Sequence, residues 1–351
     1  MWFFMVRLFT KFKQIRTFFT LPSSVEIEKN CIDSIREIVL PGFSMEQIIS
    51  LNVFHNTLGV DHHCRNFSLK TNKGTPEMEL TEKTQILELD INQKLEKSKS
   101  IIREAISLFG IENIAIAITG GKDSTTILWI FKQVCEEMGY ELPRCIFIDE
   151  GDVFVEIREF IHYIEKLWSL KIIFLKNDNV SLQVQHVGDL IQVSFLNEQN
   201  QMALEEMNFF EKEFPFIPDS TICNHLMKTI PLRNFIAEHG IKALATAIRW
   251  DEADARESEE YFSQRANPSH SRVHPILHFK ERDIWIAIFK YDIPYNSLYK
   301  LGYRSLGARC ATIKSSDIPA WRQDLENTPE RGGRDQEKEA IMGQLRALGY
   351  M

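Results

Sequence analysis

The segment from residue 119 to residue 125 has the residue types of a phosphate-binding loop. Glycines let the backbone approach an oxyanion closely, and the amides at a helix N-terminus point toward that anion. A lysine adds charge, and hydroxyl groups add donors. The spacing excludes a Walker A loop and a Gly-x-Gly-x-x-Gly dinucleotide loop. We therefore predict that these residues bind phosphate: Thr119, Gly120, Gly121, Lys122, Asp123, Ser124 and Thr125.

The elements around this loop predict an α/β fold. Alternating Ile and Ala at 111–119 predict a strand buried on both faces, and 122–140 has a helical period. Strands and helices continue to alternate, which predicts a parallel sheet with helices on both faces. The further strands are expected at 141–152, 171–175 and 242–248, and the further helices at 91–110, 155–167, 224–239 and 281–291. The segment 272–277 follows the last of these strands without an assigned element. The less regular stretch 176–222 is expected to be a substrate-facing loop.

Three regions follow from this pattern. Residues 1–90 are predicted to form an N-terminal extension of short helices and loops, and 91–270 the nucleotide-binding α/β domain. Residues 271–351 are expected to complete the substrate site and to end in a helical tail, with its helix at 335–348.

The loop resembles a known motif. Thr-Gly-Gly-Lys-Asp-Ser is similar to the Ser-Gly-Gly-x-Asp-Ser PP-loop of the ATP pyrophosphatase superfamily, with Thr119 in place of the usual Ser. TICNHLMKTIPL (221–232) and AIRWDEADAR (247–256) are similar to segments of the phosphoadenylyl-sulfate (PAPS) reductase family, which includes the small subunit of bacterial ATP sulfurylase. The resemblance covers about residues 95–351. It implies an adenine nucleotide alpha hydrolase-like fold.

The resemblance also implies roles for individual residues. Lys122, Lys228 and Arg249 are the predicted catalytic residues, because their charges would stabilise phosphate or sulfate oxygens. Asp149, where the family usually shows Asp-Thr-Gly, joins the loop as a predicted nucleotide-binding residue. The predicted substrate-binding residues are Asp251, Glu252, Arg256, His274 and Arg304.

The C-terminal segment guides the choice within the family. ENTPERGGRDQEKEAIMGQLRALGY (326–350) resembles the ending of ATP sulfurylase small subunits. We therefore predict a nucleotidyltransferase that transfers an adenylyl group from ATP to sulfate or a related anion and releases pyrophosphate. Magnesium would bridge the phosphates. By the same resemblance, a GTPase subunit is an expected partner.

Three other activities stay open. A thiol-dependent adenylyl-sulfate or PAPS reductase would use Cys310 or an external thiol, although no Glu-Cys-Gly-Leu-His segment follows Cys310. The paired cysteines that hold an iron–sulfur cluster are also missing from the sequence. The remaining alternatives are an ATP-dependent thiolation enzyme and a non-catalytic nucleotide-binding module.

Composition and charge limit the partners, the compartment and the metal sites that the sequence allows. A formal net charge of −8 argues against DNA as a partner, and six cysteines without a Cys-x-x-Cys pair favour reduced thiols in the cytoplasm. Basic residues interrupt the aromatic stretch 1–22, which excludes a membrane span but leaves surface contact with a membrane open. His55, His62, His63 and Cys64 fit no standard zinc spacing, so no metal site is predicted. The sequence leaves the oligomeric state open.

Overall fold

The computed structural model describes residues 76–252 and 256–333, which lie in one compact unit, Gly74–Met351. The predictions for residues 1–75, including the cluster of His55, His62, His63 and Cys64, fall outside the described residues. The predicted tail helix at 335–348 falls outside them as well. The first described element is helix α4 (Pro76–Leu87). No helix in the described part of the chain is long and apolar enough to span a bilayer.

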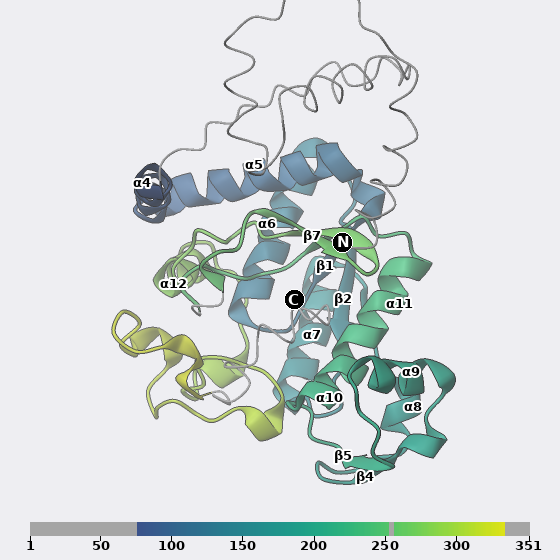
Figure 1. Ribbon diagram of the computed structural model, residues 1–351. Coiled ribbons are helices and arrows are strands. Elements are labelled where there is room, and N and C mark those ends of the chain that lie inside the picture. The colour runs from purple at the N-terminus through teal and green to yellow at the C-terminus, as the bar shows by residue number, and fades with distance from the viewer. Residues whose placement is uncertain (1–75, 253–255, 334–351) are drawn as a thin grey trace, which may run out of the picture. The chain divides into compact units, whose positions relative to one another are not determined.

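A six-stranded sheet forms the centre of the unit (Figure 1), in the order β3-β2-β1-β6-β8-β7. All neighbours are parallel except β7, which runs antiparallel to β8 at one edge. The predicted parallel sheet is thus confirmed, whereas β7 was not predicted because its sequence, FSQRA, is mostly polar. The bounds are β1 Ile114–Ala117, β2 Arg144–Ile148, β3 Ile172–Leu175, β6 Ala243–Ala245, β7 Phe262–Ala266 and β8 Ser269–Val273.

Helices cover both faces of this sheet, as predicted. On one face, α5 (Ile91–Phe109), α6 (Lys122–Met138), α7 (Val155–Trp168) and α12 (Glu281–Lys290) contribute to the main hydrophobic core. On the other face, α11 (Ile230–Glu238) packs Leu232, Phe235 and Ile236 against β1, β2 and β6. Figure 1 shows α6 and α11 on opposite sides of the strands. The strands are buried because both of their faces are covered.

Helix α6 directly follows the predicted phosphate loop. Gly121 is its N-cap, and Gly139 ends it in the left-handed conformation with φ 72°. The first amides of a helix have no acceptor inside the helix. The start of α6 therefore presents backbone donors at the end of β1, where the sequence analysis placed the loop.

The stretch 176–222 differs from the single loop that we predicted. It contains α8 (Asp178–Ser181), β4 (Leu190–Gln192), α9 (Glu198–Glu206), β5 (Glu213–Pro215) and the start of α10 (Thr221–Asn224). These elements have their own core, which includes Ile191, Leu204 and Phe214. Strands of three residues are too short to show a period, so no pattern in the sequence predicts them.

The predicted helix at 224–239 is divided. A π-helical turn, η3 (His225–Thr229), lies between α10 and α11. Such turns are frequent at functional sites, and this one carries Lys228. The short 3-10 turns of the unit are η1 (Ile111–Asn113), η2 (Val193–Phe195), η5 (Ser297–Tyr299), η6 (Arg309–Ala311), η7 (Ala320–Arg322) and η8 (Glu330–Gly333).

Candidate functional site

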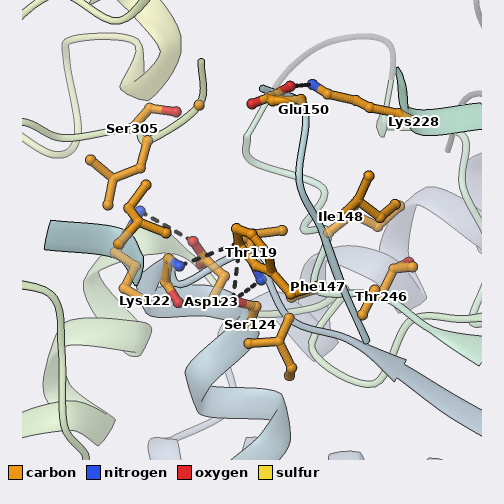
Figure 2. Close-up of a pocket in the computed structure, with 18 of the residues that line it drawn as sticks. Thr119, Lys122, Asp123, Ser124, Phe147, Ile148, Glu150, Lys228, Thr246 and Ser305 are labelled. Atoms are coloured by element: carbon orange, nitrogen blue, oxygen red, sulfur yellow. Dashed lines mark hydrogen bonds and ion pairs between the residues drawn. The ribbon is translucent and has the colours of Figure 1, made fainter. Parts of the chain in front are cut away.

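A pocket of about 270 Å³ lies at the carboxyl ends of β1, β2 and β6. Open α/β sheets bind ligands at this edge. The loop after β1 lines one part, and Ile146, Leu232 and Leu244 contribute an apolar wall. Figure 2 shows Thr119, Asp123 and Ser124 close together in this pocket. The pocket therefore joins polar loop groups to an apolar surface, as a nucleotide site requires.

The glycine loop is held in a fixed shape. Gly120 has φ 74°, and a Cβ atom there would lie 2.8 Å from Cγ2 of Ile157. The Thr119 amide donates to Ser124 Oγ at 3.1 Å, and the Lys122 amide donates to the Tyr299 hydroxyl at 2.8 Å. Only glycine tolerates this conformation together with this close approach. The sequence prediction of a glycine-dependent turn is consistent with this geometry.

Lys122 is buried, with only 1% of its surface exposed. Its Nζ lies 2.5 Å from Glu330 Oε1, 3.2 Å from Asp123 Oδ2 and 3.7 Å from Glu281 Oε1. Burial acts to lower the pKa of Lys122, but these three carboxylates outweigh it and raise the pKa well above its usual value. The lysine is therefore a permanent cation beside the glycine loop.

Arg249 is fully buried and is not among the residues that line the pocket. Its guanidinium pairs with Asp123, with Asp251 at 2.8 Å and with Glu330. The pKa of Glu330 is strongly lowered, because Arg249 and Lys122 outweigh the opposing effect of burial. Glu330 thus bridges two of the three predicted catalytic cations.

Two further ion pairs lie at the pocket. Lys228 pairs with Glu150 where β2 ends, apart from the glycine loop (Figure 2). Arg256 pairs with Glu252, which also accepts from Arg331 at 3.1 Å. Lys228 and Arg256 thus each have an acidic partner from this chain.

The structure brings only part of the predicted site together at the pocket. The predicted residues that line it are Thr119, Gly121, Lys122, Asp123, Ser124, Lys228, Glu252 and Arg256. The others do not line it: Gly120, Thr125, Asp149, Arg249, Asp251, His274 and Arg304. Asp149 pairs with Arg158 at 2.8 Å, and Arg304 pairs with Glu281 at 2.7 Å. The functional roles of all these residues stay predictions.

Sequence reasoning missed several residues of the site. Glu330 and Arg331 lie in the C-terminal segment that we used only to choose a family member, and Tyr299 was not among the predicted site residues. Arg272 lines the pocket from β8. No local pattern could have found Glu330, because its partners Lys122 and Arg249 are 208 and 81 residues away in the sequence.

The described cysteines offer no activated thiol. Cys135, Cys145 and Cys223 are buried, and Cys310 is exposed. Burial, together with Asp152, Asp219 and Glu150, raises the pKa of the Cys310 thiol to about 12. The Cys310 amide donates to Asp152 Oδ2 at 2.6 Å. Because thiolates are the reactive form, this environment holds Cys310 in its unreactive state.

Among residues 76–252 and 256–333, no group of three or more His, Cys, Asp or Glu side chains is arranged to hold a metal ion. The donor set therefore does not by itself form a magnesium site. Magnesium and ATP stay predictions, as does the GTPase partner.

Comparison with known proteins places the chain in a family. Residues 113–314, more than half of the chain, match the model of the phosphoadenosine phosphosulfate reductase domain. An adenosine 5'-phosphosulfate reductase of Bacillus anthracis (strain CDC 684 / NRRL 3495) is 23% identical over 197 residues, covering 54% of this chain and 81% of that protein. Its counterpart in Bacillus cereus (strain B4264) is 24% identical, covering 54% and 79%.

Solved structures with a similar fold include two fungal enzymes. FMN adenylyltransferase of Candida glabrata has a TM-score of 0.48 and 19% identity, covering 74% of this chain and 82% of that one. Phosphoadenylyl-sulfate reductase of Candida auris has a TM-score of 0.45 and 17% identity, covering 68% and 98%.

These relatives overturn one prediction. We predicted a nucleotidyltransferase like sulfate adenylyltransferase, but the curated relatives are named adenosine 5'-phosphosulfate reductases. The prediction of that enzyme class is therefore wrong. Its basis was the resemblance of the segment 326–350, most of which lies outside the described residues. The family prediction, in contrast, is confirmed: the chain belongs to the phosphoadenosine phosphosulfate reductase family.

Proposed function

We propose that the chain is an oxidoreductase that reduces an adenylyl sulfate, with thiols as the electron donor. The observation that carries the proposal is that the glycine loop, Lys122 and Lys228 line one pocket inside the segment matched by the family model. The pocket has an apolar wall for adenine and cations for the phosphosulfate. The names of the relatives in Bacillus support the same reaction class.

The proposed reaction has two steps. A thiolate attacks the sulfur of the sulfonate group, the bond from that sulfur to the phosphate oxygen breaks, and adenosine monophosphate leaves. A second thiolate then attacks the sulfur of the first thiol, so that a disulfide forms and sulfite leaves with the electron pair. Two thiols are oxidised while the sulfate sulfur is reduced.

The chain's own residues would stabilise the negative charges of the substrate and of the leaving phosphate in this reaction. The leaving phosphate gains negative charge as its bond to sulfur breaks, and the first amides of α6 with Lys122 would stabilise it. Lys228, in the π-helical turn, would hold the sulfonate oxygens. For this contact Lys228 has to exchange Glu150 for the substrate, which keeps its charge paired throughout.

We further propose that the attacking thiol comes from an external dithiol. Cys310 is the exposed cysteine of the described chain, but its pKa of about 12 leaves almost no thiolate at neutral pH. An external thiol with an ordinary pKa would supply more of the reactive form. A small dithiol such as dithiothreitol is therefore a sufficient reductant for the test.

Sulfite release from adenylyl sulfate in the presence of dithiothreitol tests the proposal. We expect sulfite with the wild-type chain, and a loss of about tenfold or more in kcat/KM for Lys228→Ala, since a charge-assisted hydrogen bond contributes about 1.5–3 kcal/mol. Lys132→Ala, which removes a surface pair with Glu136 on α6, is the matched control. Binding of the nucleotide without any sulfite would instead identify a non-catalytic nucleotide-binding module.

Cys310→Ser tests the source of the thiol. We expect its rate to stay within about twofold of wild type, because the thiol is held protonated. Mass spectrometry of the wild-type chain after reaction with adenylyl sulfate alone should find no added sulfonate on Cys310. An S-sulfonated Cys310, together with an inactive Cys310→Ser, would place the nucleophile in the chain and contradict the external thiol.

A further inference from the structure

The Thr246 hydroxyl lies at the end of a chain of side-chain hydrogen bonds. Thr246 directly follows β6 and lines the pocket. Its Oγ1 lies 2.8 Å from Nδ1 of His274, which directly follows β8. Nε2 of the same ring lies 3.2 Å from Ser263 Oγ on β7, and Ser263 donates to Glu259 Oε2 at 3.1 Å. Three bonded contacts thus link the wall of the pocket to a carboxylate.

This carboxylate fixes the direction of every hydrogen bond in the chain. The Glu259 carboxylate only accepts, so Ser263 donates its single hydroxyl proton to it. Ser263 Oγ then accepts from the His274 ring, which places the ring proton on Nε2, 3.8 Å from Glu259. Nδ1 is left to accept from the Thr246 hydroxyl. Because its proton is used in this way, the Thr246 hydroxyl offers only lone pairs to the pocket.

The His274 ring is neutral, so it has one proton to donate and one nitrogen that accepts. Burial, together with the charges of Arg272, Arg265 and Arg256, lowers the pKa of His274 to about 3. Arg272 in turn donates from Nε to Nε2 of His270 at 3.1 Å, and burial lowers the pKa of His270 to about 4. Both rings are therefore neutral at pH 7.

Thr246 adjoins the apolar wall of the pocket. Side chains two residues apart in an extended segment lie on the same face, so Thr246 shares a face with Leu244 of this wall. The Thr246 amide donates to the Val273 carbonyl at 2.9 Å, which continues the pairing of β6 with β8 as far as Thr246. Figure 2 shows Lys122, beside the glycine loop, well apart from Thr246. A base that packs on the apolar wall therefore has a polar edge within reach of the Thr246 hydroxyl.

We infer that the Thr246 hydroxyl accepts a hydrogen bond from the 6-amino group of an adenine base. Glu259, Ser263 and His274 are positioning residues that fix the polarity of this hydroxyl. The inference rests on the proposed function, since it assumes that a nucleoside packs on the apolar wall, and it deepens that function by naming the residue that selects the base.

A fixed acceptor is suited to selecting a base. The 6-amino group of adenine donates, whereas the 6-oxo group of hypoxanthine or guanine accepts. A 6-oxo group would face the lone pairs of Thr246 and would leave this acceptor unpaired, so the 6-oxo bases are disfavoured. A ribose hydroxyl can donate or accept, and a threonine with a fixed polarity would have no advantage in binding it. The direction of the four-residue chain therefore points to the base.

Calorimetry on the full chain tests the inference with three probes that differ at position 6 of the base. Adenosine 5'-monophosphate has an amino group there, inosine 5'-monophosphate an oxo group and purine riboside 5'-monophosphate a hydrogen. We expect wild type to bind the adenosine probe at least tenfold more tightly than either of the others. Thr246→Val should reduce this preference to about twofold or less. Thr312→Val, which removes a buried hydroxyl outside the pocket, should keep the wild-type preference.

Ser263→Ala tests the positioning residues separately, since Ser263 does not line the pocket. Without this acceptor, the His274 proton can move to Nδ1 and be donated to Thr246, whose hydroxyl can then donate to a 6-oxo group. The ratio of the adenosine to the inosine affinity should therefore fall about fivefold or more. A merely structural role would weaken both probes and leave this ratio as it is. Ser269→Ala, at an exposed position on β8, is the matched control.

Each other result overturns the inference. Equal wild-type affinity for the three probes would show that Thr246 does not select the base, even if Thr246→Val fails to fold. Equal losses for all probes in a folded Thr246→Val would assign the residue a structural role. A wild-type ratio in Ser263→Ala would contradict the fixed polarity. If wild type binds none of the probes, nucleotide binding fails, and the proposed function fails with it. Nucleotide binding without a preference leaves the proposed function intact.

Discussion

The two cationic parts of the pocket differ in how their charge is balanced. At the glycine loop, Lys122 and Arg249 are paired with Asp123 and with Glu330, which comes from the C-terminal segment. At β8, Arg272 has a neutral histidine as its hydrogen-bond partner. The carboxylates of this chain therefore balance the charge at the first part, whereas Arg272 contacts an uncharged partner.

This difference has a consequence for binding at the glycine loop. Exchanging the Glu330 carboxylate for a phosphate keeps the two buried cations paired throughout, so the charge cost of binding stays small. Glu330 belongs to the turn η8 (Glu330–Gly333), so we expect the exchange to change the position of this turn.

The largest effect is expected for Glu330→Gln, which removes the carboxylate charge between Lys122 and Arg249. The free chain should lose about 3 kcal/mol of stability, because Lys122 and Arg249 stay buried with one charge fewer between them. Adenosine 5'-monophosphate should restore more stability to this variant than to wild type. Thermal unfolding with and without the nucleotide measures both effects.

Glu326→Gln is the control for that variant. Glu326 lies in the same segment, but its side chain is half exposed and pairs with Arg282 at the surface, so the stability change should stay below about 0.5 kcal/mol. If Glu330→Gln is as stable as its control, the carboxylate does not balance the glycine-loop cations.

An intermediate effect is expected for Gly121→Val, which affects the glycine-loop part alone. A Cβ atom at this position would lie 3.2 Å from Thr119 Oγ1 and 3.3 Å from the Tyr299 hydroxyl, so the branched side chain displaces the group that fixes the Lys122 amide. Affinity for adenosine 5'-monophosphate should fall about 30-fold, or about 2 kcal/mol, in calorimetry. Gly139→Ala, at the other end of α6, should bind normally even if it is less stable. Unchanged affinity in a folded Gly121→Val would remove the loop from the site.

The two cationic parts also differ in how their contributions to stability depend on pH. Burial lowers the pKa of His274 to about 3, so the unfolded chain, with a histidine pKa near 6.5, binds the proton first as pH falls. The stability from the neutral ring is complete above about pH 6.5 and is lost as pH decreases toward the folded-state value. The lowered pKa of Glu330 has its effect only below about pH 4.5. Between pH 7 and pH 5, the contribution of the neutral His274 ring to the free energy of unfolding should therefore decrease. The contribution of the ionised Glu330 carboxylate should stay constant over the same range.

Urea unfolding at pH 7 and pH 5 measures this difference. His274→Gln should lose up to about 2 kcal/mol less than wild type between these pH values. His162→Gln, which changes an exposed histidine on α7, should lose as much as wild type. An identical pH dependence for wild type and His274→Gln would contradict the neutral state of this ring.

The sequence predicted the local parts of the site well. The Gly-Gly break between a buried strand and a periodic helix places the loop, since both periods are strong there. The same signals fail for β4 and β5, whose three residues show no period, and for β7, an edge strand of mostly polar residues. The enzyme class was wrong because it depended on a loose likeness of the C-terminal segment, whereas the family model matches residues 113–314.

By itself, the sequence determined the glycine loop, the alternation of strands and helices, and the family, because each depends on residues that are close together in the chain. Only the tertiary structure decided which of the buried cations are paired with carboxylates. Lys122 and Glu330 are 208 residues apart, and Arg249 and Glu330 are 81 apart, so no local pattern pairs them. Arg272 resembles Arg249 in the sequence, as a basic residue near the end of a strand. The fold gives Arg249 three carboxylates and Arg272 a neutral histidine, and burial strengthens the electrostatic effect of that difference.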